Sequence, residues 1–184
     1  MRIVALRPDD RALVLQVARL LVEGFGEQEP DAFPDMRSAL AEVRKSFGPG
    51  RLSRVAVDPP RTALGWIGGI RLYRGRTWEL HPLVVRPDRQ RQGIGRALVR
   101  DLERQIARQR ATTIFLGTDD VDGRTSVAGV ELYPDVLGKA RRIRNLHGHP
   151  YEFYEKLGYT VVGVLPDANG PGKPDIFMAK RARR

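Results

Sequence analysis

Residues 83–98 constrain the fold of this 184-residue chain more than any other segment. An apolar run at 83–85 leads into a basic turn containing Gly93 and Gly95, and an amphipathic helix is predicted at 93–108. A strand that enters a helix through such a turn directs backbone N–H groups and the positive end of the helix dipole at one point. Glycine lets a ligand approach without an intervening Cβ. The segment predicts a pyrophosphate-binding loop, although strand–turn–helix connections with two glycines also occur without a ligand.

The hydrophobic pattern of the remaining chain predicts both strands and helices. Helices are expected at 10–24, 36–47, 93–108, near 136–146 and at 150–157. Strands are expected at 2–6, 52–57, 63–73, 77–85, 112–116, 159–164 and 175–180. This order predicts the α/β class, as a single domain over residues 1–184 in which helices flank one mixed sheet (an α+β arrangement). A long acidic insertion is expected at about 118–148.

Composition excludes several classes of protein. Cysteine is absent, which removes disulfide scaffolds, thiolate nucleophiles and Cys-ligated zinc. Three histidines are few for a metal centre, and no metal is expected. No apolar run approaches the roughly 20 residues that span a bilayer, and the start of the chain does not read as a secretory signal. A cytoplasmic location is therefore expected.

The formal net charge of +10 is distributed unevenly along the chain. Residues 86–110 hold eight arginines against three acidic residues, whereas 23–35 hold five acidic residues and no basic one. Residues 118–135 are also acidic. The basic segments leave a nucleic-acid-binding module open as a less favoured alternative. The acidic segments instead predict binding of a small polycationic amine.

Two motifs resemble the GNAT acetyltransferases. The first is Gln90-x-x-Gly93-x-Gly95, and the second, about 60 residues later, is the run at 153–159 that begins Phe-Tyr and ends Gly-Tyr. This resemblance implies a GNAT fold and acetyl-CoA as co-substrate, with the pyrophosphate on the loop amides and the pantetheine arm along the preceding strand. The implied coenzyme contacts are Leu83, Val84, Val85, Gln90, Arg91, Gln92, Gly93, Ile94, Gly95, Arg96 and Tyr154.

The resemblance extends to one branch of that superfamily. Residues 78–85, 116–120, 149–159 and 169–176 are similar to the aminoglycoside 6'-N-acetyltransferases of the chromosomal Gram-positive type. The implied reaction acetylates the 6'-amine of an aminoglycoside by direct transfer in a ternary complex. Another amine remains an alternative acceptor: a polyamine, an amino sugar or a protein N-terminus.

Four residues are the catalytic candidates. The resemblance implies that Glu79 deprotonates or holds the amine and that the Tyr154 hydroxyl protonates the leaving thiolate. It also implies that the backbone N–H of Leu83 stabilises the thioester oxyanion. His81 is predicted to contact substrate or relay a proton, or alternatively to pack structurally. Strand alternation places Glu79, His81 and Leu83 on one face.

Further residues are candidates for binding the acceptor. Asp119, Asp120 and Asp122 follow a predicted strand and suit a polycationic amine, although any one of them could instead lie in a solvated loop or cap a helix. Phe25 and Tyr73 fall at aromatic substrate-contact positions of the resembled branch. The long segment around 118–148 is expected to form a substrate platform or a dimer contact, and a homodimer is predicted.

Overall fold

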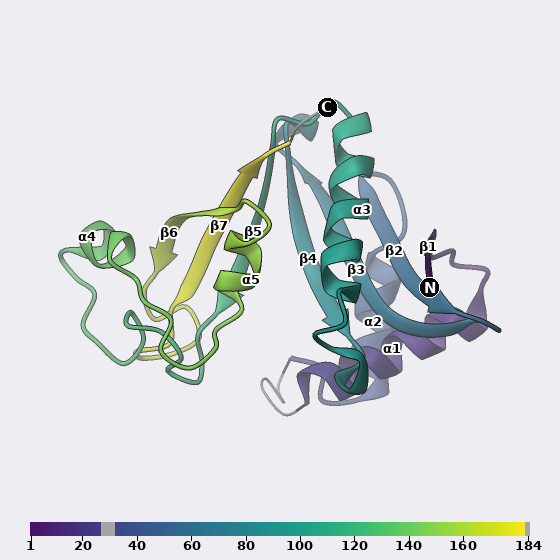
Figure 1. Cartoon of the computed structure of the whole chain (residues 1–184), viewed down its shortest axis with the longest axis horizontal. Coiled ribbons are helices and arrows are strands. Elements are labelled where there is room, and N and C mark those ends of the chain that lie inside the picture. Colours follow the sequence, from purple (N-terminus) through teal and green to yellow (C-terminus); the bar gives the residue numbers. More distant parts are fainter. Residues whose placement is uncertain (27–31, 183–184) are drawn as a thin grey trace. The chain divides into compact units, whose positions relative to one another are not determined.

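The computed structural model describes residues 1–26 and 32–182 as two compact units. The first comprises Met1–Ile114 with Ala182, and the second comprises Phe115–Arg181. Figure 1 labels the elements of both. No helix in the described ranges is both long and apolar enough to cross a membrane.

The first unit is an antiparallel sheet with helices on both faces. Its strands, in spatial order, are β1 (Arg2–Ala5), β2 (Arg51–Asp58), β3 (Thr62–Leu72) and β4 (Thr77–Val85). Its helices are α1 (Arg11–Phe25), α2 (Met36–Lys45) and α3 (Ile94–Arg108), with two short 3-10 turns, η1 (Tyr73–Gly75) and η2 (Pro87–Arg89). The strands and α-helices match the predicted ones to within about two residues, whereas the 3-10 turns were not predicted.

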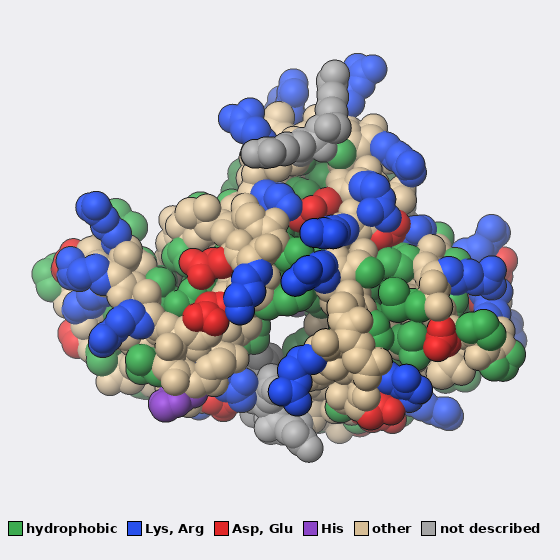
Figure 2. All heavy atoms as spheres, in the orientation of Figure 1, with side chains coloured by type: hydrophobic (Ala, Val, Ile, Leu, Met, Phe, Trp, Pro, Cys, Tyr) green, Lys and Arg blue, Asp and Glu red, His purple; other side chains and the backbone are tan. Residues whose placement is uncertain are grey.

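Helices α1 and α2 cover one face of this sheet, and α3 crosses the other (Figure 1). The apolar stripe of α1 packs on strand side chains that include Val55 and Trp66. On the opposite face, Gly65 and Gly69 of β3 lie against leucines of α3. The apolar repeat of α3 faces the sheet, as its sequence predicts, and its arginines face solvent. Figure 2 shows Lys and Arg side chains along this helix.

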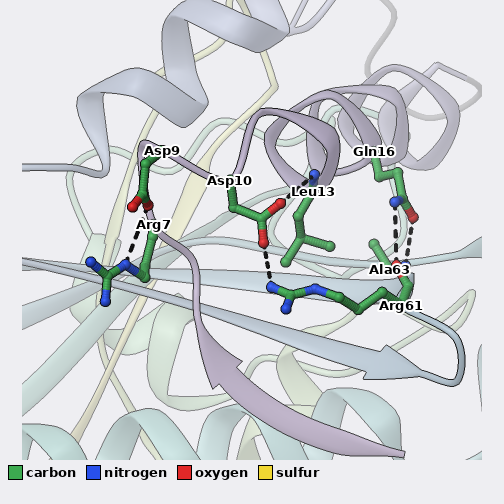
Figure 3. A network of polar contacts seen from close by, with 7 residues as sticks. All are labelled: Arg7, Asp9, Asp10, Leu13, Gln16, Arg61 and Ala63. Carbon is green, nitrogen blue, oxygen red and sulfur yellow. Dashed lines mark hydrogen bonds and ion pairs between the residues drawn. The ribbon is translucent and has the colours of Figure 1, made fainter.

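Side-chain caps fix where α1 begins. The Asp10 carboxylate accepts a hydrogen bond from the Leu13 backbone N–H at 3.2 Å and pairs with Arg61 (Figure 3). One turn later, the Gln16 amide accepts from the Ala63 N–H at 2.9 Å and donates to the Arg61 carbonyl. Because Arg61 and Ala63 flank the start of β3, these bonds tie the first turns of α1 to the sheet.

The second unit contains β5 (Thr113–Asp119) from Phe115 onward, followed in spatial order by β7 (Asp175–Arg181) and β6 (Thr160–Leu165). Strands β6 and β7 are antiparallel. Two short helices, α4 (Val136–Arg141) and α5 (Tyr151–Glu155), lie between β5 and β6 along the chain. The helix expected at 136–146 ends at Arg141, because the chain then turns to form a bridge between Asn145 and Thr125. The long insertion is therefore hydrogen-bonded within itself.

Candidate functional site

The predicted pyrophosphate loop joins β4 to α3 in the first unit. Gly93 precedes the helix with φ +84°, a left-handed conformation that glycine adopts at low energetic cost. No side chain in the described part of the chain caps this helix, and a Cβ built on Gly93 would meet no atom within 4 Å. The first turn of α3 therefore has no side-chain cap among the described residues, and the space beside Gly93 is open. Such an arrangement suits an anion, which is what the predicted coenzyme would present.

Contacts within the loop hold its shape. The Arg86 guanidinium donates to both oxygens of Asp88, at 2.6 and 2.8 Å. This hydrogen bond lowers the pKa of the Asp88 carboxyl and raises that of Arg86. The Gln90 side chain donates to the Val85 carbonyl at 3.4 Å, across the base of the loop. The exposed residues of the predicted coenzyme set are Gln90, Arg91, Gln92, Gly93 and Arg96.

Strand β4 carries a bulge that changes one prediction. Ile67 of β3 pairs with Leu83, but Gly69 pairs with Leu80, so two residues of β4 face Gly68 alone. A Cβ on Gly68 would lie 2.2 Å from the His81 carbonyl oxygen, so this close approach requires glycine.

The extra residue reverses the alternation of side chains. Glu79 pairs with Ile70, on the face that carries Trp66 and packs on α1 and α2. Leu83 lies with Ile67 on the face of α3. The expectation that Leu83 shares a face with Glu79 and His81 was wrong, because simple alternation cannot anticipate a bulge.

Glu79 is half-buried, whereas His81 is exposed. The Nε2 atom of His81 lies 3.9 Å from an oxygen of Glu42 on α2. Glu42 also pairs with Lys45 at 3.1 Å. The neighbouring helix thus adds a carboxylate beside His81 that no sequence motif indicated.

The predicted aromatic contacts, also in the first unit, differ in exposure. Phe25 is half-buried at the end of α1, and its ring packs edge-on against Phe33 at 5.1 Å. Tyr73 is 76% exposed in η1 and so is free to contact a ligand. Of the acidic stretch at 23–35, residues 27–31 lie outside the described residues.

Tyr154 lies on α5 of the second unit and is buried. Its ring packs edge-on against Phe153 at 5.0 Å and Tyr159 at 5.8 Å. Burial raises the pKa of its hydroxyl, so the group keeps its proton at neutral pH. This protonation state is the one that a proton donor needs.

The three acidic candidates in the second unit have different surroundings. Asp120 is 1% exposed, and its oxygens accept from the backbone N–H groups of Arg124 and Thr125 at 2.7 and 2.8 Å. It is buried and holds the loop, an arrangement that neither alternative, a solvated loop or a helix cap, describes. Asp122 pairs with Arg124 at 2.9 Å, and Asp119 is half-buried and accepts from Asn169. The carboxylates available to a ligand are thus those of Asp119 and Asp122.

Sequence patterns gave no indication of two buried polar residues. His149 is 2% exposed between β5 and α5, where its ring meets the Asp119 carbonyl at 3.0 Å. Asp101 faces the sheet from α3 and pairs with Arg54 at 2.6 Å. Asp101 directly precedes Leu102 of the predicted apolar stripe, which does not itself include this position. Within the described residues no cluster of three or more His, Cys, Asp or Glu could hold a metal ion.

Comparison with known protein families places this chain in one of them. The model of the acetyltransferase (GNAT) family matches residues 14–133, well over half of the chain. The chain belongs to the GNAT acetyltransferase family. This membership confirms the predicted fold class, a mixed α/β sheet flanked by helices, and the predicted reaction class. No curated protein sequence matches the chain.

Solved structures of GNAT enzymes resemble the chain over its full length. An aminoglycoside 6'-N-acetyltransferase complexed with coenzyme A is 42% identical, with a TM-score of 0.91 and coverage of 100% of this chain and 98% of that one. The aminoglycoside 6'-N-acetyltransferase from Enterococcus faecium is also 42% identical, with a TM-score of 0.88 and the same coverage. The ribosomal-protein-S18-alanine N-acetyltransferase from Escherichia coli is 16% identical (TM-score 0.64, covering 100% and 94%) and shares the fold alone.

Proposed function

We propose that this GNAT enzyme transfers the acetyl group of acetyl-CoA to the 6'-amine of aminoglycosides. The observation that carries the proposal is its similarity, at 42% identity over the whole chain, to an aminoglycoside 6'-N-acetyltransferase complexed with coenzyme A. The uncapped start of α3 behind Gly93 supports an anionic coenzyme. The half-buried Asp119 and exposed Asp122 support a polycationic acceptor.

Coenzyme binding and the transfer reaction are assigned to different residues. Residues Gln90 to Arg96 bind the pyrophosphate through backbone N–H groups, and Val84 and Val85 contact the pantetheine arm. The acceptor forms one N–C bond as the thioester C–S bond breaks. Glu79, with His81 beside it, takes the ammonium proton before attack, and the Leu83 N–H stabilises the oxyanion. The Tyr154 hydroxyl donates a proton to the sulfur and regains one from the nitrogen, which loses its second proton as the amide forms.

Acceptor binding is proposed for Phe25, Tyr73, Asp119 and Asp122. Asp120 is left out because its two oxygens already accept backbone hydrogen bonds. A single functional domain over residues 1–184, a cytoplasmic location and a homodimer remain part of the proposal. Exposed apolar side chains of the second unit, such as Leu137 on α4 and Val162 on β6, support a dimer contact.

Calorimetry of coenzyme A binding to two glycine-to-alanine variants tests the coenzyme loop. Gly93→Ala adds a Cβ at φ +84° in the loop, whereas Gly48→Ala adds one at φ +110° in a turn of the same unit. Neither Cβ would meet an atom within 4 Å. We expect both variants to lose about 1–2 kcal/mol of stability through backbone strain. Gly93→Ala alone should bind coenzyme A at least tenfold more weakly.

The acceptor is tested by comparing kcat/KM for kanamycin and for spermidine. A clear preference for kanamycin, with acetylation at the 6' position by mass spectrometry and NMR, supports the proposal. A protein that binds coenzyme A but acetylates no aminoglycoside would refute the acceptor assignment and leave the family intact. Equal loss of coenzyme affinity in both glycine variants would refute the loop assignment.

A further inference from the structure

His149 connects two segments of the second unit, the end of β5 and the start of α5, through one buried side chain. It lies just before α5, the helix that carries Tyr154, and its ring is packed 5.7 Å from that of Tyr151. The ring also reaches Asp119 at the end of β5. The mechanism proposed above makes no use of this histidine.

Both ring nitrogens have partners. Nδ1 lies 3.2 Å from the backbone nitrogen of Tyr151, and Nε2 lies 3.0 Å from the carbonyl oxygen of Asp119. A backbone N–H can only donate and a carbonyl can only accept. The ring must therefore be neutral, with Nδ1 unprotonated and the single ring proton on Nε2.

The backbone of His149 is held as well. The Asn145 side chain accepts from the His149 N–H at 2.7 Å and donates to its carbonyl at 2.9 Å. The residue thus has little freedom to move its ring elsewhere. A second proton on Nδ1 would point at the Tyr151 N–H, and two donors cannot bond to each other.

We propose that His149 is a positioning residue whose neutral ring ties Asp119, a proposed acceptor-binding residue, to the first turn of the Tyr154 helix. The inference rests on the proposed function. Protonation of the ring breaks the bond to Tyr151 and loosens this connection. The enzyme therefore loses acceptor affinity in acid through a group that touches neither substrate.

The charges around the ring act in both directions. Burial lowers the pKa of His149 most strongly, and nearby Arg124 lowers it further. The Asp119 backbone contact and the carboxylates of Asp120 and Asp119 act to raise it. Tyr151, the other titratable neighbour, is neutral at these pH values because burial raises its pKa. The net shift is downward, which keeps the ring neutral at pH 7.

Steady-state kinetics from pH 5 to 8 with kanamycin test the proposal. The variants are His149→Gln, which retains one donor and one acceptor but does not titrate, His149→Ala, and the control His147→Gln. His147 is exposed, and in the described residues only its backbone takes part in a hydrogen bond. KM for kanamycin should rise about tenfold in acid for wild type and His147→Gln, the equivalent of one lost hydrogen bond.

His149→Gln should lack that acid-dependent rise in KM, and His149→Ala should show a raised KM at every pH. KM for acetyl-CoA should change less than KM for kanamycin, because every proposed coenzyme contact except Tyr154 lies in the first unit. A His149→Gln variant that keeps the wild-type acid dependence, or an alanine variant that changes only its thermal stability, would overturn the proposal.

Hydrogen exchange on the wild-type protein provides a readout that needs neither activity nor a variant. After correction for intrinsic exchange rates, the Tyr151 amide should lose protection in acid. The Arg124 and Thr125 amides should lose protection with it, because they bond to Asp120, the neighbour of Asp119. Unchanged protection of Tyr151 while NMR shows His149 protonating would refute the inference. Absence of aminoglycoside acetylation, with this exchange behaviour intact, would instead refute the proposed function.

Discussion

Asp101→Asn tests the buried charge under α3. The Asp101 carboxylate pairs with Arg54 at 2.6 Å and with Arg104 at 2.9 Å. The Arg54 side chain is only 16% exposed, whereas that of Arg104 is 61% exposed. The asparagine keeps the shape of the side chain but leaves the Arg54 guanidinium enclosed without a counter-charge. Breaking a buried pair in this way costs about 3–5 kcal/mol.

Because Arg54 retains some solvent contact, we expect the lower end, about 3 kcal/mol. For a chain of this length this corresponds to a fall in Tm of roughly 6–12 °C. Urea unfolding, monitored by tryptophan fluorescence, measures the loss of unfolding free energy directly. Both tryptophans, Trp66 and Trp78, are buried in the first unit and so report on the same sheet.

Arg104→Ala is the matched control. It removes the exposed partner of the same carboxylate and should cost about 0–1 kcal/mol. The double variant Asp101→Leu with Arg54→Met should recover much of the loss, since no charge then remains enclosed. A loss below about 1 kcal/mol in Asp101→Asn, or an equal loss in Arg104→Ala, would refute the reasoning.

Three further predictions concern the bulge and the second unit. Gly68→Ala should destabilise the protein by about 1–3 kcal/mol or more in urea unfolding, because the new Cβ would strike the His81 carbonyl. The control Gly163→Ala should be near neutral, because its Cβ would enter open space. Asp120→Ala should cost about 1–3 kcal/mol, because two buried N–H groups lose their acceptor; thermal melting measures this, and a neutral effect would contradict it. The pKa of His149 is lowered from 6.5 in the folded protein, so as the pH falls the unfolded chain protonates this histidine before the folded chain does. The free energy of unfolding should therefore decrease below about pH 6.5. The decrease should be smaller in His149→Gln, which lacks the titrating ring.

Local patterns predicted the elements of the fold well. The repeat of α1, the proline before α5 and the glycine turn before α3 each act over a few neighbouring residues, so their effects are visible in sequence. The helix expected to reach residue 146 ends at Arg141 because Asn145 pairs with distant Thr125. Such pairing depends on residues 20 positions apart, which periodicity cannot register.

The candidate site was predictable where a motif carries it. The strand–turn–helix order around Gly93 is the predicted one, whereas the three acidic candidates could not be told apart. Which of them holds the loop depends on the backbone N–H groups that each carboxylate reaches. The partners of His149 are likewise set by the folded backbone, so its environment was not visible beforehand.

The extra residue in β4 places two nearby side chains on different surfaces of the sheet. Glu79 and Leu83 lie on opposite sides of the sheet although only three residues stand between them. In the proposed function, substitutions on the α1 and α2 side can alter the choice of amine while the α3 side keeps its packing. A single inserted position thus lets the surface around Glu79 change independently of the packing between the sheet and α3.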